Sequence, residues 1–313
     1  MHRNGSHLAR AALTLFALPC LLATAPRAVA ADHDDTDVLK SIGRHDARLT
    51  DLHVFTREAP RGRAGKTRTD LLIGVSTNPT IPTSLASYTF PSDLEITISV
   101  DRHSAVDFDD EAGAPFGGTV LNPAGIAADV QFRVTFDPDS GPRLESPGLD
   151  RGTEVRFFVG LRDDPFIRGP RAGRNVASIV LEMPLAAVAG GRPHGTLLVW
   201  ASSSVPGPSG PTGDMAGRAL RSQFAENMAL NDYTEPAEQA AALHVRPDVV
   251  IFDTTRPAAY PNGRDLTDDV VDLVGDPRIL NTDCPSPGNP AACNPSENDV
   301  PFLPNFPYLA PPH

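Results

Sequence analysis

Strict alternation of apolar and polar residues in two segments constrains the fold of this chain more than any other feature. In residues 94–100 the polar positions are Glu95, Thr97 and Ser99. The apolar positions of the two segments are Leu94, Ile96, Ile98 and Val100, followed by Val130, Phe132, Val134 and Phe136. Because residues i, i+2 and i+4 of a strand share one face, each segment predicts a strand with one buried and one hydrated face. That pattern is typical of antiparallel sheets.

Four shorter β-prone runs add to these two strands. They are residues 71–76, 154–160, 176–183 and 196–201, each with Gly, Pro, Asn or Asp close by. Proline makes up 32 of 313 residues, about twice the usual share of roughly 5%, and it is spread along the chain. We therefore expect a mainly β fold of β-sandwich-like antiparallel sheets, with a few short helices and a long irregular, proline-rich C-terminal region.

Helical spacing is found mainly in the C-terminal half. Residues 266–274 carry apolar side chains at helical intervals behind Asp265, a candidate N-cap, and residues 236–243 begin with Pro236. Residues 205–213 read VPGPSGPTG, a composition that predicts a loop. We expect a single β-rich domain over residues 31–313, with a candidate internal boundary at residues 205–213.

The first thirty residues have the pattern of a secretory signal peptide. Arg3 and Arg10 precede an apolar run over residues 11–23, and Ala28-Val29-Ala30 supplies a small-x-small cleavage signal. The run is shorter than the roughly 18 to 20 residues needed to cross a bilayer. We expect cleavage near Ala30, a periplasmic or extracellular location, and no membrane span.

Two cysteines follow the expected leader, Cys284 and Cys293. In an oxidising compartment they are expected to close a small loop through a disulfide, because prolines and a glycine between them let the chain fold back. A zinc site is the weaker interpretation, since its ligands usually show C-x2-4-C spacing.

The net charge of −12 limits the partners of the chain. Such a surface repels nucleic acid and anionic lipid headgroups, so it favours cations and neutral ligands. Solubility alone also accounts for the charge. The expected partner is an unknown small ligand or an envelope or extracellular component, with no nucleic acid.

Four segments together resemble a family of exported bacterial proteins, the domain-of-unknown-function family 4331. They are the segments FVGLRDDPF at 158–166, NV to EMP at 175–184, PNGRDLTDDVVD at 261–272 and FLPNFPYLAPP at 302–312. The resemblance covers roughly residues 150–312. Residues 214–219, DMAGRA, match the family pattern only in Asp, Gly and Arg. The resemblance implies an exported protein with no established activity, and it leaves the chemistry open.

Polar residues in and beside these segments are the candidate ligand-binding residues. Asp163 and Asp164 follow an expected strand, and Asp268 and Asp269 stand in the first turn of an expected helix. The full candidate set is Arg162, Asp163, Asp164, Arg218, Asn262, Arg264, Asp268 and Asp269. A shared site requires these side chains to converge. The alternative is that the acids cap turns, pair with Arg162 or Arg168, and stabilise a helix N-terminus.

The acidic run after residue 100 offers Asp101, Asp107 and Asp109 as candidate ligands for a divalent cation such as calcium. It lacks the D-x-D-x-D-G spacing of calcium loops, so a solvated acidic loop is the alternative. No cofactor is otherwise evident.

No serine-hydrolase elbow, dinucleotide-binding glycine motif, P-loop or HExxH motif occurs in the sequence. Because no complete catalytic set can be assembled, we expect a non-catalytic ligand-binding or surface-binding module. The alternatives are a metal-assisted enzyme that uses Asp163, Asp164, Asp268 and Asp269, and a structural envelope component.

Overall fold

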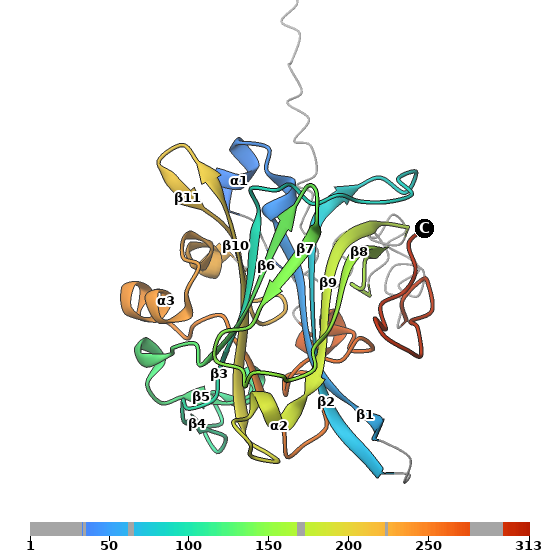
Figure 1. Cartoon of the computed structure of the whole chain (residues 1–313). Coiled ribbons are helices and arrows are strands. Elements are labelled where there is room, and N and C mark those ends of the chain that lie inside the picture. Colours follow the sequence, from blue (N-terminus) through green and yellow to red (C-terminus); the bar gives the residue numbers. More distant parts are fainter. Residues whose placement is uncertain (1–32, 34–35, 62–65, 168–172, 223–224, 276–296) are drawn as a thin grey trace, which may run out of the picture.

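The computed structural model describes residues 33, 36–61, 66–167, 173–222, 225–275 and 297–313, and shows two antiparallel sheets packed face to face (Figure 1). The mainly β fold expected from the sequence is therefore confirmed. The leader and the expected pair Cys284–Cys293 lie outside the described residues.

The first sheet has the order β1-β2-β9-β8. Its strands are β1 (Leu49–Arg61), β2 (Lys66–Ile81), β8 (Arg156–Asp163) and β9 (Asn175–Pro184). In the central strand β9 nine of ten residues are buried, because both faces of this sheet are covered. Double coverage explains why residues 176–183 form an uninterrupted apolar run rather than an alternating one.

The second sheet has the order β11-β10-β3-β6-β7, and β12 and β13 also pair with β10. Its strands are β3 (Glu95–Asp101), β6 (Val130–Asp137), β7 (Gly141–Glu145), β10 (Thr196–Gly207), β11 (Gly210–Thr212), β12 (Met215–Ala216) and β13 (Val250–Asp253). A separate small hairpin pairs β4 (Val106–Asp107) with β5 (Thr119–Val120).

The main core lies between the two sheets. Apolar side chains from the inner faces of both sheets form one cluster, with Val54, Ile73 and Ile179 from the first sheet and Ile98 and Phe132 from the second. In β6 buried and half-exposed residues alternate without a break, as the sequence predicts. Burial of such side chains stabilises the fold by about 1.5–3 kcal/mol each relative to full exposure.

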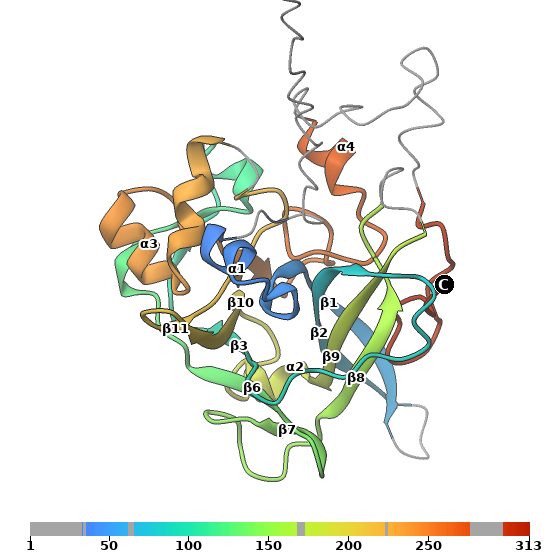
Figure 2. The same cartoon turned by 90° about the horizontal axis from the view of Figure 1, so that it is seen from above.

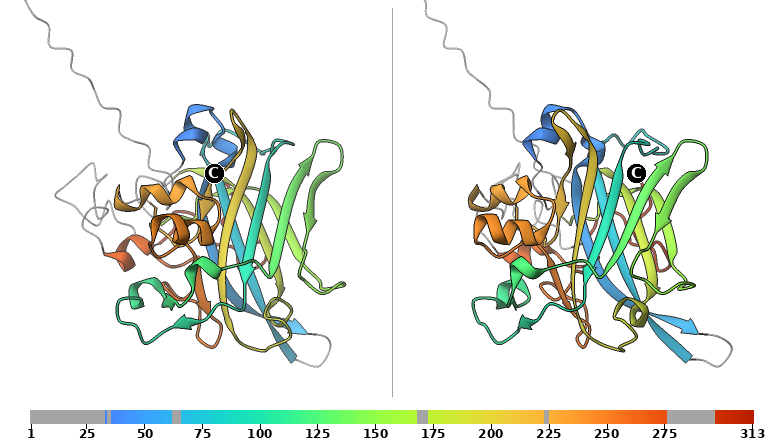
Figure 3. Two further views of the ribbon diagram at one scale, coloured as in Figure 1. Left: turned by 90° about the vertical axis from the view of Figure 1, so that its left-hand side faces the viewer. Right: turned by 60° about the vertical axis from the view of Figure 1, so that its left-hand side comes forward.

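The outer faces of the two sheets carry further layers. Phe306 and Leu309 of the C-terminal segment 297–313 pack with Phe55 and Val180 on the outer face of the first sheet, and Figure 2 shows this red segment beside β8 and β9. Trp200 on the outer face of β10 packs with residues that include Val249. Figure 3 shows α3 and the β4–β5 region on this side.

The helices are short. They are α1 (Asp37–Ser41), α2 (Leu185–Val188), α3 (Pro236–Leu243) and α4 (Val270–Val274), with 3-10 turns at His45–Ala47, Ala114–Phe116, Pro123–Gly125 and Ala225–Asp232. The helix predicted at 236–243 is confirmed with the same bounds, and proline stands in its first turn. None of the helices among the described residues combines the length and apolar character that crossing a bilayer demands.

The second predicted helix is shorter than expected. Asp265 does not cap it: its carboxylate accepts the backbone N–H of Thr267 in the preceding turn. The helix begins at Val270, and Asp269 is its N-cap, with Oδ1 3.3 Å from the backbone nitrogen of Asp272. The apolar spacing was correct, but the start was wrong because two acids compete for the capping role.

Two local expectations also need correction, and one strand was missed. Residues 205–213 form a hairpin of β10 and β11 rather than a loop, with Val205 paired to Thr212. Ser99 is fully buried rather than hydrated, because its cross-strand neighbour is Trp200 in the covered outer layer. The strand β1 was not predicted; its covered outer face mixes the buried polar residues Asp51 and His53 with Phe55.

Candidate ligand-binding pocket

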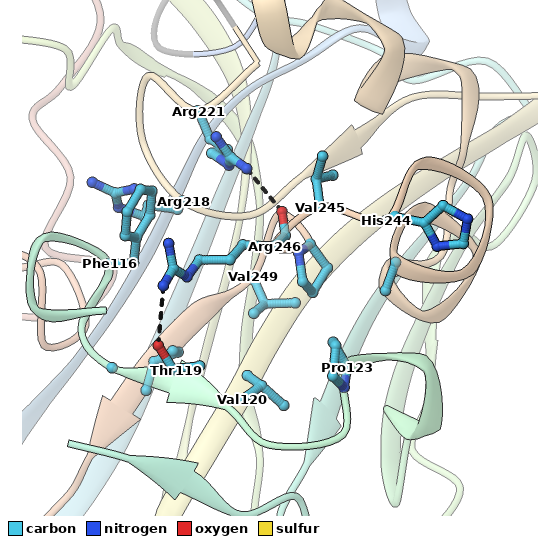
Figure 4. A pocket seen from close by; sticks show the side chains of 14 residues that line it. Phe116, Thr119, Val120, Pro123, Arg218, Arg221, His244, Val245, Arg246 and Val249 are labelled. Carbon is cyan, nitrogen blue, oxygen red and sulfur yellow. Dashed lines mark hydrogen bonds between the residues drawn. The ribbon is translucent and has the colours of Figure 1, made fainter. Parts of the chain in front are cut away.

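A pocket of about 430 Å³ lies on the outer side of the second sheet (Figure 4). Its apolar wall includes Val120 of β5, Ile251 of β13 and Val249, which directly precedes β13. Val249 and Ile251 also belong to the outer-face cluster around Trp200. The pocket is therefore a hollow between the β13 edge of the sheet, the β4–β5 hairpin and the end of α3.

Three arginines gather at one end of this pocket, around the ring of Phe116. The guanidinium carbons of Arg218, Arg246 and Arg221 lie 4.3, 5.0 and 5.4 Å from the ring centroid. We call these four residues the arginine cluster. A neighbouring cavity of about 480 Å³ shares Phe116, Arg218 and Arg221 as lining residues, so the cluster forms part of the wall of both cavities.

The backbone around Arg218 is held tightly. Its N–H donates to Oδ1 of Asp248 at 2.7 Å, and a Cβ on the preceding Gly217 would lie 2.2 Å from the carbonyl oxygen of Asp248. Leu220 adopts a left-handed backbone conformation, with φ 62°. For a branched side chain this conformation is unfavourable by roughly 1–3 kcal/mol. The tight turn places Arg218 and Arg221 on the same side of the pocket.

The other two arginines are connected to each other. Nη2 of Arg221 donates to the carbonyl oxygen of Arg246 at 2.9 Å. Nη2 of Arg246 lies 3.4 Å from both Oγ1 of Thr119 and Oδ2 of Asp110. The hydroxyl of Thr119 donates to the same Asp110 oxygen at 2.6 Å, and this hydrogen bond lowers the pKa of Asp110. Asp110 is thus an ionised partner of Arg246.

The ionisable side chains that line the described part of the pocket are all basic. Among the described residues that line the pocket, the ionisable side chains are Arg218, Arg221, Arg246 and His244, and none is a carboxylate. The Nε atoms of Arg218 and Arg246 are buried and make no hydrogen bond within the described part of the chain. Buried donors of this kind need an acceptor, so the pocket is suited to a ligand that carries negative charge.

Of the predicted ligand-binding residues, Arg218 lies in this pocket. Asn262 instead orders a turn: its Oδ1 accepts the N–H of Asp253 at 2.8 Å, and its Nδ2 donates to the carbonyl oxygen of Pro257 at 3.0 Å. Arg264 is buried and forms an ion pair with Asp51. These two predicted residues therefore hold the fold together.

Among the described residues, the paired aspartates contact different parts of the backbone and do not share one site. Oδ2 of Asp268 accepts the backbone N–H groups of Asp265 and Tyr260, at 2.7 and 2.9 Å, and Asp269 caps α4. Oδ1 of Asp164 accepts the N–H of Phe166 at 3.1 Å. These contacts match the alternative interpretation, in which acids order turns and helix ends.

Asp163 has different neighbours. It ends β8 and lies 2.9 Å from the imidazole of His313. The adjacent Arg162 does not pair with it: its guanidinium lies over the ring of Phe158, 4.0 Å from the centroid. Successive side chains of a strand point to opposite faces, and burial lowers the pKa of Arg162.

Carboxylates of the acidic run at 101–109 accept hydrogen bonds from the backbone. Oδ1 of Asp101 accepts the N–H groups of His103 and Ser104 at 2.7 and 2.8 Å, and Asp107 accepts the N–H of Asp109 at 2.9 Å. In the described ranges, the three-residue group with the spacing of metal ligands is Asp163, Asp299 and His313. Calcium binding at Asp101, Asp107 and Asp109 stays a prediction.

Comparisons with protein-family models, curated proteins and solved structures gave no match for this chain. The resemblance to family 4331 therefore stays a prediction. Phe116, Arg221 and Arg246 were missed in the sequence because they are spread over about 130 residues. The one local signal was a second arginine three residues after Arg218 in an acidic chain.

Proposed function

We propose that this protein is a non-catalytic binding module for a small organic anion, held in the pocket of the arginine cluster. The observation that carries the proposal is the lining itself, with Arg218, Arg221 and Arg246 and no carboxylate among its described residues. The ligand class is a carboxylate or phosphate that also carries an apolar group.

The charge of the whole chain favoured cations and neutral ligands, and the proposed ligand class departs from that expectation. Net charge describes the mean field, whereas a ligand in a pocket responds to the charges within a few ångströms of it. Asp110 contacts Arg246 at the edge of hydrogen-bonding distance, but the ionisable side chains among the described lining residues are three arginines and a histidine. The lining of the pocket is thus positively charged within an acidic molecule.

Guanidinium groups suit this role because each presents several N–H donors in a plane and stays protonated. Phe116 keeps Arg218 and Arg246 stacked rather than extended into solvent, which reduces the entropy lost when a ligand binds. The apolar wall formed by Val120, Val249 and Ile251 would bury the uncharged part of the ligand.

A binding experiment with three probes tests the proposal. Phenyl phosphate and benzoate combine an anionic group with an apolar ring, and benzylamine carries the opposite charge on a similar ring. We expect calorimetry to show binding of the two anions and none of the amine. Trp200 provides a second signal, because it is the single tryptophan of the chain and packs with Val249 and Ile251.

Variants locate the site. Arg218→Gln and Arg246→Gln should each weaken phenyl phosphate binding about 10- to 100-fold, because a hydrogen bond to a charged group contributes roughly 1.5–3 kcal/mol. Arg143→Gln is the matched control, since Arg143 is an exposed arginine on β7. Absence of binding by both anions, or equal binding by benzylamine, would refute the proposal.

A further inference from the structure

A second group of side chains, far from the arginine cluster in the sequence, gathers where the C-terminal segment 297–313 meets the end of β8. Asp163 ends this strand, which forms an edge of the first sheet. The N–H of Asp163 donates to the carbonyl oxygen of Ala310, and the N–H of His313 donates to Oδ1 of Asn175 at 2.9 Å. These bonds fix His313 against the strand end.

We propose that Asp163, Asp299 and His313 bind a zinc ion, which joins the C-terminal segment to the edge of the first sheet. Each residue offers one ligand atom, and all three atoms lie within 4.8 Å of one another. Nε2 of His313 lies 2.9 Å from Oδ1 of Asp163 and 3.4 Å from Oδ2 of Asp299. This proposal is independent of the arginine cluster.

The spacing fits a first-row metal ion. Zinc binds imidazole nitrogen and carboxylate oxygen at about 2.0–2.2 Å, so two ligands of a tetrahedral site are roughly 3.3 Å apart. The two separations from Nε2 of His313, 2.9 and 3.4 Å, lie close to that value. The donor set also favours zinc over calcium, because calcium sites in proteins are built from oxygen ligands and an imidazole is a typical zinc ligand.

Charge balance at the site supports a cation. The side chain of Asp163 is fully buried, that of Asp299 is 30% exposed, and the side chain that bridges them is an imidazole. Arg162, the adjacent cation, lies on the opposite face of the strand over Phe158. Two neighbouring carboxylates, one of them buried, are unfavourable without a positive charge between them.

The surroundings hold the ligand atoms in place. Nδ2 of Asn298 donates to Oδ2 of Asp163 at 2.5 Å, which leaves Oδ1 directed at His313. The N–H of Gly173 donates to Oδ2 of Asp299 at 2.6 Å. Such outer contacts commonly orient metal ligands.

Asn175 gives an independent indication that a ligand binds here. It stands opposite Asp163 in the register of β8 and β9 and is fully buried. Its Oδ1 is occupied by the N–H of His313, whereas its Nδ2 has no hydrogen-bond partner within the described residues. A buried amide donor needs an acceptor, and a water molecule bound as a further zinc ligand would supply one.

Zinc binding to the purified chain tests the proposal. After loading with zinc chloride and dialysis, elemental analysis should find one zinc per chain attributable to this site, and calorimetry should show that calcium does not compete. Asp163 is buried, so the informative variants are His313→Gln and Asp299→Asn at the accessible ligands. Each should lower zinc affinity by about tenfold or more, and zinc should raise Tm for the unaltered chain but not for His313→Gln.

The matched control is His194→Gln, because His194 contacts the carbonyl oxygen of Thr254 rather than the metal group. Circular dichroism of each variant confirms that it is folded before zinc is added. Equal zinc content and affinity in the unaltered chain and in both ligand variants would overturn the proposal. So would the absence of retained zinc in the unaltered chain.

Discussion

Arg264 and Asp51 form a buried ion pair, with Nη2 and Oδ1 3.0 Å apart and side-chain exposures of 2% and 0%. The pair lies beside a backbone bridge in which Arg264 and Val54 exchange two hydrogen bonds, of 2.9 and 3.0 Å. Gly263 in turn donates its N–H to the carbonyl oxygen of Ile251 in β13. The Asn-Gly-Arg turn thus ties β13 of the second sheet to β1 of the first.

Removing one partner of this pair should destabilise the protein strongly. We expect Arg264→Met to lower the free energy of unfolding by about 3–5 kcal/mol, because it removes the guanidinium group that contacts the buried Asp51 carboxylate. The double variant with Asp51→Asn should recover part of that loss. Urea unfolding measures both values.

An exposed pair serves as the control for Arg264. Arg256 and Asp253 are 2.9 Å apart, and the Arg256 side chain is 51% exposed. Arg256→Met should therefore change the free energy of unfolding by about 1 kcal/mol or less. Similar losses for Arg256→Met and Arg264→Met would contradict the importance of burial.

The same covered face predicts a dependence of stability on pH. His53 neighbours Asp51 on β1, and burial together with the charge of Arg264 holds the pKa of its imidazole well below the ordinary 6.5. The unfolded chain therefore binds a proton at His53 near pH 6.5, while the folded chain does not. The contribution of His53 to stability is complete above pH 6.5 and is lost as the pH falls below it.

His53→Asn removes this titrating group and should flatten the stability profile between pH 6.5 and more acidic conditions. Chemical unfolding at several pH values, with the unaltered chain measured in parallel, provides the comparison. Another histidine would be responsible if the two profiles keep the same slope.

The β class and much of the inner core follow from the sequence, because a strand with one buried face is visible as alternation. Val130 and Phe132 are examples, and both lie on the inner face of the second sheet. The layers that cover the outer faces of the sheets could not be predicted from the sequence. Asp51, His53 and Ser99 have polar side chains that normally face water, yet each is buried under a segment distant in the sequence.

The pocket was even harder to predict from the sequence. Arg218 was selected through a family resemblance, while Arg246 and Phe116 join it only because the covering segments of the second sheet converge there. At the other site Asp163 was selected, but Asp299 and His313 were not. No local spacing relates a strand end at residue 163 to a segment more than 130 residues later.

Adding one methyl group at Gly263 should destabilise the protein markedly. It has φ 71°, and a Cβ at this position would lie 2.6 Å from the carbonyl oxygen of Val54. Gly263→Ala should therefore combine left-handed strain with loss of the bridge to β1, lowering the free energy of unfolding by roughly 2–4 kcal/mol.

Gly191 separates these two contributions. It also has a positive φ, 80°, but a Cβ there would meet nothing within 4 Å. Gly191→Ala should lower the free energy of unfolding by about 1 kcal/mol, from conformational strain alone. Equal losses for the two variants would show that the approach to Val54 has no energetic effect.

Tyr308 in the C-terminal segment gives the last prediction. Its hydroxyl donates to Oε1 of the buried Glu182 at 2.9 Å. Burial, the hydrogen bond and the negative charge of Glu182 raise the pKa of Tyr308 to about 12, so the unfolded chain ionises this phenol before the folded one does. Its contribution to stability is complete below about pH 10 and is lost as the pH rises towards 12.

An alkaline titration followed by tyrosinate absorbance tests this assignment. Because burial also raises the pKa of Tyr88, Tyr308→Phe should lower the amplitude of the late ionisation near pH 12 by one tyrosine. The variant should also be less stable at neutral pH by about 0.5–1.5 kcal/mol through loss of one hydrogen bond. Tyr233→Phe is the control. If the amplitude of the late step is unchanged in Tyr308→Phe, then Tyr308 does not donate to Glu182 in solution, and the segment 297–313 does not pack on the first sheet at this point.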